Sequence, residues 1–282
     1  MNLSAPAIFR IAATPMNPLP PELAALSARC VRTAVDAALV AGDLLRRNFG
    51  EPVVVSEEKD YDIKIETDRQ CQESICRTIL RDFPDHRILG EEGKAGSPSG
   101  TVEWIVDPLD GTVNFTYGIP HFCTSIAVRC EGELLAGVIY DPIRQELFTA
   151  ERGRSPRLNG KPIAASGRSL LSKAVCVVGF SRSRAGIEQG LRLVQYLVPR
   201  VRKVRLTGSA ALDLAYVASG RIDAYFEQEI HLWDIAAGVL LLQQAGGCVF
   251  QLPNPDADTF RVTATNGLLD LGGLPIGESA AP

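Results

Sequence analysis

At the centre of this chain stands the stretch Trp104-Ile-Val-Asp107-Pro-Leu-Asp110-Gly-Thr112, in which apolar, β-branched residues run directly into acidic ones. The apolar residues predict a buried strand, and Pro108, which has no backbone N–H group, predicts that strand pairing stops directly after Asp107. Gly111 permits a turn, and the hydroxyl of Thr112 can cap a following helix. Two carboxylates this close repel each other unless a cation or a shared proton relieves them. The stretch is therefore either a capped turn or half of a site for a divalent cation.

The composition of the chain bears on the class of protein and on its partners. Its 282 residues suffice for one large or two abutting α/β domains. Lys and Arg number 29 against 33 Asp and Glu, and no basic run tracks a phosphate backbone, so we expect no nucleic-acid partner. No apolar run approaches the roughly 20 residues of a membrane helix, so no membrane partner is expected. Seven scattered cysteines without a CxxC pair predict reduced core residues of a cytoplasmic protein.

The first half of the chain predicts helices packed against a sheet. We expect helices at 27–49 and from Thr67 or Asp68 to about 81. Strands are expected at 52–56, 62–65, 87–90, 104–106, 122–129, 133–140 and 145–150, with a polar turn at 57–60. The last three strands follow one another closely and predict an antiparallel meander. The strand at 87–90 runs into Glu91, a third acidic residue at a strand end.

The second half predicts alternating strands and helices. Strands are expected at 174–178, 201–206, 223–227, 248–251 and 261–265, and helices at 187–197, 211–219 and 235–245. Thr207-Gly-Ser-Ala210 opens the second of these helices, and such a start exposes N–H groups that suit a phosphate, unless it is an ordinary N-cap. Trp233-Asp234 opens the third helix. Residues 1–21 and 272–282 predict a flexible arm and tail around one domain at 22–271, whose halves meet near 155.

Four acids, Glu91, Asp107, Asp110 and Asp234, fall at predicted strand ends or helix starts, where α/β folds place functional groups. Each alone is consistent with a cap. Together with Thr112 and the helix start at Gly208, they form a set able to hold about two or three Mg²⁺ ions and a phosphate. Competing chemistry is missing from the sequence: the three histidines lack zinc spacing, and there is no GxSxG elbow or GxxxxGK[ST] loop.

Several stretches resemble the signatures of the inositol monophosphatase family. They are Gly90-Glu-Glu92, Trp104 to Phe115, Gly137 to Pro142, Leu158-Asn-Gly160, Gly208-Ser-Ala210 and Trp233 to Gly238. The likeness runs from about Ala28 to Gly267. It implies an α/β fold, a five-layered αβαβα sandwich of the sugar-phosphatase type, usually a homodimer. It also implies Mg²⁺-dependent hydrolysis of small phosphate monoesters, often inhibited by Li⁺.

The same resemblance implies a role for each matching residue. The first metal is held by Glu91, Asp107 and the carbonyl of Leu109, and the second by Asp107, Asp110 and Asp234. Glu91 also supports a third ion. Asp62 orients the hydroxyl of Thr112, which with Glu91 aligns the attacking water. The substrate meets Asp110, Gly111, Thr112, Gly208, Ser209 and Ala210, and Glu227 contacts one of its hydroxyl groups.

The hairpin that carries Asp62 departs from the family pattern Asp-x-Val-Thr-x-x-Asp. Here Lys64 and Ile65 replace the Val-Thr pair. The metal ligands are unaffected, but we expect a change in hairpin packing, in the affinity for the third ion and in lithium inhibition. Glu229 stands near a position that is often small in the family, beside the predicted substrate mouth. It is expected to alter substrate choice.

The expected function is therefore hydrolysis of a small phosphorylated polyol or sugar, foremost inositol 1-phosphate, by in-line attack of water without a covalent intermediate. Fructose 1,6-bisphosphate, histidinol phosphate and nucleotide 3′-phosphates are alternative substrates, because relatives share the metal site and differ around it. An alternative from another class is a non-catalytic binding or regulatory member of the fold. The intact set of acids favours the enzyme, and phosphate release with and without Mg²⁺ separates the two.

Overall fold

The computed structural model describes residues 19–52, 55–59, 62–181, 183–254 and 258–275. The arm predicted at 1–21 and the tail predicted at 272–282 fall mostly outside these ranges. The domain limits given above therefore stay predictions. No helix in the described ranges is both long enough and apolar enough to cross a membrane.

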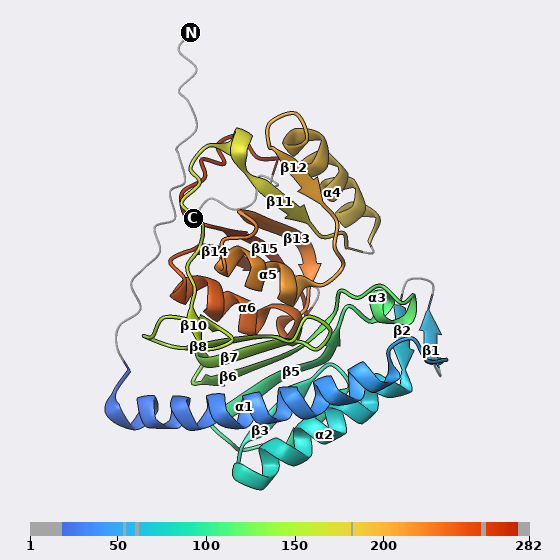
Figure 1. The fold of residues 1–282 in the computed structure, drawn as a ribbon, viewed down its shortest axis with the longest axis vertical. Helices are drawn as coiled ribbons and strands as arrows, with labels where there is room; N and C mark the ends of the chain where they lie inside the picture. Colours follow the sequence, from blue (N-terminus) through green and yellow to red (C-terminus); the bar gives the residue numbers. More distant parts are fainter. Residues whose placement is uncertain (1–18, 53–54, 60–61, 182, 255–257, 276–282) are drawn as a thin grey trace.

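The helices and sheets stack in five alternating layers, so the predicted αβαβα fold class is confirmed (Figure 1). The helices α1 (Pro21–Asn48) and α2 (Glu66–Asp82) cover the outer face of the larger sheet. Between the two sheets lie α5 (Ala210–Ala218) and α6 (Leu232–Gln244). The helix α4 (Arg184–Leu197) covers the far face of the smaller sheet.

The larger sheet contains the predicted meander and one parallel pair of strands. Its described strands are, in spatial order, β10 (Lys161–Pro162), β9 (Arg157–Leu158), β8 (Glu146–Glu151), β7 (Glu133–Asp141), β6 (Cys123–Cys130), β5 (Val102–Asp110), β3 (Arg87–Gly90) and β4 (Gly93–Gly96). The strands from β5 to β8 pair antiparallel, whereas β3 and β5 are parallel. The carboxyl ends of β3 and β5 therefore lie side by side. The short strands β4, β9 and β10 were not predicted, because they are too short for a recognisable alternation.

The smaller sheet comes from the second half of the chain. Its described strands are, in spatial order, β12 (Lys203–Arg205), β11 (Val175–Val178), β13 (Ala224–Ile230), β15 (Phe260–Thr265) and β14 (Cys248–Pro253). A separate hairpin pairs β1 (Val55–Lys59) with β2 (Asp62–Ile65). Two short helical segments complete the fold, α3 (Thr112–Thr116) and η1 (Leu171–Lys173).

The middle helical layer packs tightly because small residues face its neighbours. A Cβ atom added to Gly238 would lie 2.4 Å from the side chain of Leu214, so α6 touches α5 where only glycine fits. A Cβ atom on Gly137 of β7 would lie 3.0 Å from the carbonyl oxygen of Ala237. The helix α6 therefore lies directly on the larger sheet, and its first turn is brought close to the ends of β3 and β5.

Pro108 does not end its strand, contrary to the prediction. The strand β5 continues to Asp110, and its pairing with β6 shifts register between Asp107 and Asp110. Within this irregular segment the missing N–H group of Pro108 costs no ladder bond, and the carbonyl of Pro108 accepts a hydrogen bond from the hydroxyl of Thr124 at 3.0 Å. The bulge lets two acids three residues apart approach the same site.

Three local boundaries also differ from the predictions. The polar turn expected at 57–60 is wrong for 57–59, which belong to β1 because backbone pairing with β2 outweighs side-chain polarity there. The first helix begins at Pro21, since proline is well suited to a first helical turn. The second helix begins at Glu66, and Asp68 accepts the N–H of Ile65 at 3.0 Å from inside the helix rather than capping it from outside.

Candidate active site

The parallel pair β3 and β5 places Glu91 beside Asp107. Gly90 pairs with Val106, and the N–H of Glu91 donates to the carbonyl of Val106 at 3.1 Å. Glycine at position 90 lets the side chain of Gln72 approach the backbone closely, because a Cβ atom there would lie 2.2 Å from the side-chain oxygen of Gln72. That oxygen accepts the N–H of Glu92 at 3.0 Å and so holds the turn that carries Glu91.

Three of the predicted acids form one cluster. Carboxylate oxygens of Asp107, Asp110 and Asp234 lie within 4.8 Å of one another. Asp107 and Asp110 are buried at the end of β5, and Asp234 is the third residue of α6, where its carboxylate accepts the N–H of His231 at 2.9 Å. Asp234 therefore stabilises its helix start from within, and its remaining oxygen is available to the cluster.

The electrostatics of the cluster favour a cation. Burial, followed by the charges of Glu91, Asp110 and Asp234, raises the pKa of Asp107 well above its usual range. Burial and then the charges of Asp110 and Glu91 raise the pKa of Asp234 in the same way. Oxygen donors that repel one another in a buried site match the preference of Mg²⁺, whose charge would remove that repulsion. The donor set thus fits a hard divalent cation.

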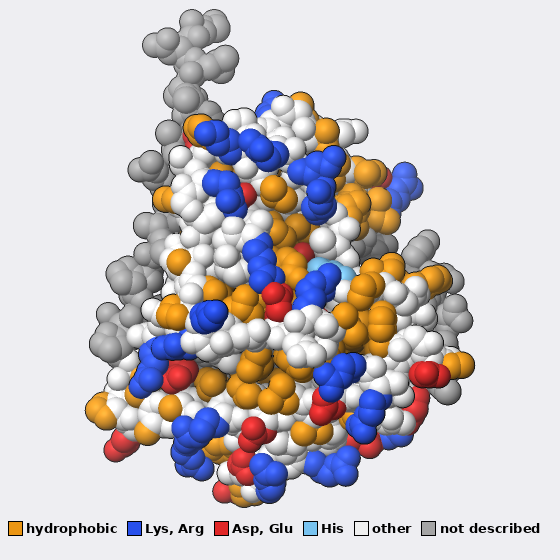
Figure 2. All heavy atoms as spheres, in the orientation of Figure 1, with side chains coloured by type: hydrophobic (Ala, Val, Ile, Leu, Met, Phe, Trp, Pro, Cys, Tyr) orange, Lys and Arg blue, Asp and Glu red, His pale blue; other side chains and the backbone are white. Residues whose placement is uncertain are grey.

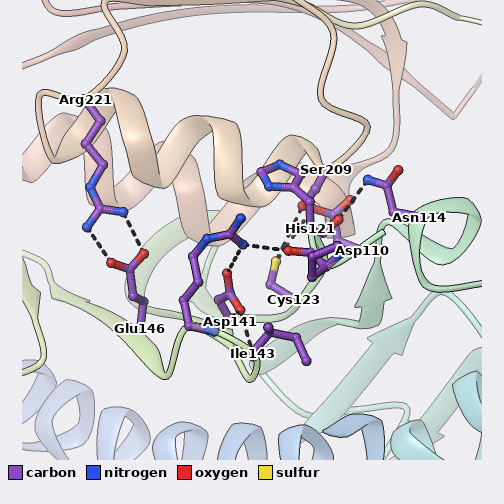
Figure 3. A network of polar contacts seen from close by, with 11 residues as sticks. Asp110, Asn114, His121, Cys123, Asp141, Ile143, Glu146, Ser209 and Arg221 are labelled. Atoms are coloured by element: carbon purple, nitrogen blue, oxygen red, sulfur yellow. Dashed lines mark hydrogen bonds and ion pairs between the residues drawn. The ribbon is translucent and has the colours of Figure 1, made fainter. Parts of the chain in front are cut away.

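Asp110 is held by the N-terminal end of α5 (Figure 3). Its carboxylate accepts the hydroxyl of Ser209 at 2.6 Å and the backbone N–H groups of Ala211 at 2.8 Å and Ala210 at 3.3 Å. Burial raises the pKa of Asp110 to about 6, although these hydrogen bonds oppose the rise. The N–H groups that the sequence suggested for a phosphate therefore donate to a carboxylate of the protein itself. A substrate contact of Gly208, Ser209 and Ala210 stays a prediction.

The thiol of Cys123 forms part of the same buried environment. Its sulfur lies 3.7 Å from the carboxylate of Asp110 and 3.8 Å from the hydroxyl of Ser209. Burial, followed by the charges of Asp110 and Asp107, raises the pKa of this thiol well above its usual range. Cys123 therefore acts as a neutral donor behind Asp110. Cys30, Cys71 and Cys176 are likewise buried, as the sequence predicted. The prediction of core residues is wrong for Cys76, Cys130 and Cys248, which are only partly buried.

The turn after β5 brings two further predicted residues together. The hydroxyl of Thr112 donates to the carbonyl of Leu109 at 3.0 Å, and the N–H of Leu109 donates to Asp107 at 3.0 Å. Thr112 does not cap the following helix as predicted, because Gly111 occupies the cap position of α3 with a φ of 97°. A left-handed backbone favours glycine there. The carbonyl of Leu109, which is predicted to bind a metal, and the hydroxyl of Thr112, which is predicted to orient water, are thus in contact.

Asn114 is a site residue whose role the sequence did not reveal (Figure 3). Its side-chain amide donates to the carbonyls of His121 at 2.8 Å and Thr207 at 2.9 Å, and Asn114 is buried. It thereby ties the turn after β5 to the loop that leads into α5. The only sequence signal was a polar residue inside a short apolar helix, which does not identify its partners.

Two more carboxylates, Asp213 and Glu227, belong to the surroundings of Asp110. The hydroxyl of Tyr225 donates to Glu227, and Thr207 donates to the buried Asp213 at 2.5 Å. Burial raises the pKa of Asp213 well above its usual range, the bond from Thr207 lowers it, and the charges of Asp110 and Glu227 raise it further. Nothing in the sequence distinguishes Asp213 from an ordinary acidic residue in the first turn of a helix.

Two further predicted residues, Glu229 and Asp62, have no contact with the acid cluster among the described side chains. The hydroxyl of Ser183 donates to Glu229 at 2.6 Å and accepts the N–H of Gly186 at 3.0 Å, which links Glu229 to the start of α4. The backbone of Asp62 begins β2, but its side chain lies outside the described residues. Its predicted bond to Thr112 therefore stays a prediction.

Comparisons with known proteins agree with the geometry. A model of the inositol monophosphatase family matches residues 27–270. The chain is 42% identical over 230 residues to the Nus factor SuhB of Xylella fastidiosa, which covers 80% of this chain and 83% of that protein. It is 40% identical over 250 residues to inositol monophosphatase 2 of Solanum lycopersicum, with coverage of 85% and 94%.

Two solved structures have the same fold. The extragenic suppressor protein suhB from Bartonella henselae superposes with a TM-score of 0.79 at 36% identity, covering 84% of this chain and 94% of that one. The inositol monophosphatase from Anabaena superposes with a TM-score of 0.75 at 38% identity, covering 85% and 91%.

Proposed function

The chain belongs to the inositol monophosphatase family and is a phosphomonoester hydrolase, and from this premise we propose that it hydrolyses inositol 1-phosphate in a Mg²⁺-dependent reaction. The observation that carries the proposal is the cluster of Asp107, Asp110 and Asp234, whose oxygens lie within 4.8 Å of one another. The raised pKa values of these three acids mean that their ionised forms are unfavourable together unless a cation neutralises them. The scattered cysteines support a cytoplasmic location.

The residues that would hold the metal are those assigned by the family resemblance. Glu91, Asp107 and the Leu109 carbonyl would hold one ion, and Asp107, Asp110 and Asp234 a second, with Glu91 supporting a third. Bound Mg²⁺ supplies an activated water and neutralises charge on the leaving oxygen. The hydroxyl of Thr112, together with Glu91 and Asp62, orients that water. The fixed turn at Gly111 and the loop at Gly208, Ser209 and Ala210 position the phosphate and the ring.

The substrate end of the proposed site is acidic and suits a polyol. Glu227, bonded by Tyr225, accepts hydrogen bonds from substrate hydroxyl groups, which a carboxylate does well. Fructose 1,6-bisphosphate, histidinol phosphate and nucleotide 3′-phosphates are the alternative substrates within the same chemistry.

The decisive experiment measures phosphate release from a panel of these monoesters after removal of metal with EDTA and after addition of Mg²⁺. We expect no turnover without metal, recovery with Mg²⁺, and the highest kcat/KM for inositol 1-phosphate. Full activity in metal-free buffer would refute the metal assignment. Millimolar Li⁺ is expected to inhibit, although Lys64 and Ile65 depart from the family pattern in the hairpin β1–β2. A lack of inhibition would contradict the lithium proposal alone.

Similarity to proteins named Nus factor supports a second candidate, a Nus-factor role that does not require catalysis. The two candidates separate in a cell that lacks this chain. If the Nus-factor role is correct, Asp107→Asn would restore growth of this cell as well as the wild type does. Under the first, the same variant would fail, because it lacks a ligand shared by both metals.

We also propose that the protein is a homodimer whose interface includes α3. Val113, Tyr117 and Ile119 are exposed, Tyr117 by 72%, and Leu206 is exposed beside Thr207, which Asn114 links to α3. Figure 2 shows hydrophobic side chains gathered over this region. A patch of this kind is typical of an interface.

The homodimer prediction is checked by light scattering behind a sizing column. The wild type should have about twice the chain mass, and Tyr117→Asp should shift it towards the monomer. The matched control Leu170→Asp changes another exposed apolar residue away from α3 and should stay dimeric. A monomeric wild type would contradict the proposal.

A further inference from the structure

A cleft of about 700 Å³ lies beside the edge of the larger sheet formed by β3 and β4. Residues of β3 and β4, with Glu103 of β5 and Arg129 of β6, form one wall, and Leu232, Trp233 and Phe260 form the other. Its volume falls in the range of about 300–1,000 Å³ that is typical of small-molecule pockets. Among the described residues that line it, none is an acid of the cluster at Asp107, so it is separate from the proposed catalytic site.

One wall of the cleft is apolar and aromatic. Leu232, Trp233 and Phe260 are each only partly buried. The imidazole of His231 stacks on the indole of Trp233, with ring centroids 4.5 Å apart and an interplanar angle of 15°. His231 also contacts the carbonyl of Asp258 at 3.0 Å, so the indole rests against an anchored ring. A fixed, partly exposed aromatic surface suits an apolar or aromatic ring.

The opposite wall is cationic. Arg87 and Arg129 both pair with the single carboxylate of Glu103, at 3.0 Å and 2.5 Å, so one guanidinium charge is left in excess. The buried Nε of Arg87 has no hydrogen-bond acceptor within the described part of the chain. Lys94 is exposed on β4 and makes no ion pair there either. Asp258 is the second carboxylate that lines the cleft, beside Glu103. The three cationic side chains of Arg87, Arg129 and Lys94 therefore leave a net positive charge.

From these two walls we propose that the cleft binds a small aromatic anion. Its charged group pairs with Lys94 and the two arginines, while its ring packs against Trp233 and Phe260. Charge-assisted bonds to guanidinium and ammonium groups are strong, and they are stronger beside an apolar wall that excludes water. The modest excess of positive charge suits one small anion rather than a nucleic-acid strand.

The cleft is placed to influence the acid cluster. Trp233 directly precedes Asp234, and Leu89 of the cleft wall lies two residues before Glu91. An occupant therefore touches both segments that carry predicted metal ligands. We expect occupancy to change the Mg²⁺ concentration needed for half-maximal activity. This coupling rests on the proposed function, whereas binding in the cleft does not.

The probe for the test is 1-anilinonaphthalene-8-sulfonate, which joins a sulfonate to fused aromatic rings, titrated into the full-length protein. Hydrogen exchange should show protection in 87–98 and 230–236 on binding. Lys94→Glu should weaken binding about tenfold, because it replaces an attractive charge with a repulsive one. The control Lys161→Glu reverses an exposed charge on β10, at the opposite edge of the same sheet, and should not change the affinity.

Two results would overturn the proposal. One is binding that leaves 87–98 and 230–236 unprotected, for example binding that protects only the region around α3. The other is equal binding of the neutral analogue N-phenyl-1-naphthylamine, since the cationic wall would then be unused. Both measurements remain valid if phosphatase activity is absent, so a failure of the cleft and a failure of the proposed function are distinguishable.

Discussion

Asp234 is a residue at which a structural and a catalytic role coincide. Its carboxylate accepts the N–H of His231 at the start of α6, and it also lies in the cluster with Asp107 and Asp110. The first role needs only an oxygen acceptor, which asparagine also supplies. The second needs a negative charge, which asparagine lacks. Substitution by asparagine therefore separates the roles.

We predict that Asp234→Asn folds but turns over its substrate very slowly. Loss of one charged metal ligand removes several kcal/mol of transition-state stabilisation, so kcat should fall on the order of 10³ or more at about 1.4 kcal/mol per tenfold. The measurement is kcat over a range of Mg²⁺ concentrations, with partial recovery at high Mg²⁺ if metal affinity is the main defect. A normal kcat would mean that Asp234 only stabilises the helix start.

At the scale of elements, the site depends on a contact between α3 and the loop before α5. Asn114 bridges them by donating to the carbonyl of Thr207, 93 residues further along the chain. The bulge at Pro108 and the N-terminal end of α5 then meet at Asp110. The catalytic geometry therefore requires that two separately formed elements are held in one relative position.

We predict that Asn114→Ala lowers both stability and kcat. Leaving buried carbonyls without a donor costs about 1–3 kcal/mol, and the turn at Thr112 loses its fixed relation to Ser209. The matched control is Asn266→Ala: Asn266 is also buried, and its amide donates to Ser166 at 2.9 Å and Arg168 at 2.7 Å, away from the cluster.

Thermal melts and kcat for both asparagine variants check this prediction. The two variants should lose similar stability, but only Asn114→Ala should lose activity beyond what its folded fraction explains. If both variants keep their kcat, Asn114 is a structural residue without a positioning role.

At the scale of the whole molecule, the layer of α5 and α6 between the two sheets buries the acids and creates their repulsion. The folded pKa of Asp110 is raised from 3.8 to about 6, and the pKa values of Asp107 and Asp234 are raised as well. At a pH between the pKa of the unfolded state and the higher pKa of the folded state, the folded state binds more protons than the unfolded state. The contribution of these acids to stability is therefore present at low pH and is lost as the pH rises from about 4 through about 6 and above.

We predict that the metal-free protein becomes less stable relative to Asp234→Asn as the pH rises from about 4 to about 7. Asp234 is missing from the variant, so the difference reports the stability lost when this buried acid ionises beside Asp107 and Asp110, and Mg²⁺ should reverse that loss by neutralising the cluster. The measurement is the difference in Tm between the two proteins across this range, with EDTA or with Mg²⁺. Taking the difference cancels the titration of other groups. A constant difference in EDTA would contradict the electrostatic account.

Much of the secondary structure and the location of the site followed from the sequence. The meander β6–β8 was recognisable because its strands are long, apolar and separated by short turns. Glu91, Asp110 and Asp234 stood out because acids directly follow strands or open helices. The signature around Asp107 then implied the family and the five-layered fold, which the structure and the comparisons bear out.

Other features are decided only by tertiary structure. Asp110 accepts the N–H groups of Ala210 and Ala211 at the start of α5; Asn114 joins α3 to Thr207; Pro108 lies in a bulge; and β4 forms a sheet edge that borders a cleft. Sequence periodicity reports which side of a helix or strand is buried, because burial repeats with the local geometry. It carries no information on which partner, 100 residues away in the case of Asp110 and Ala210, meets a given polar group, because packing of separate layers determines that contact.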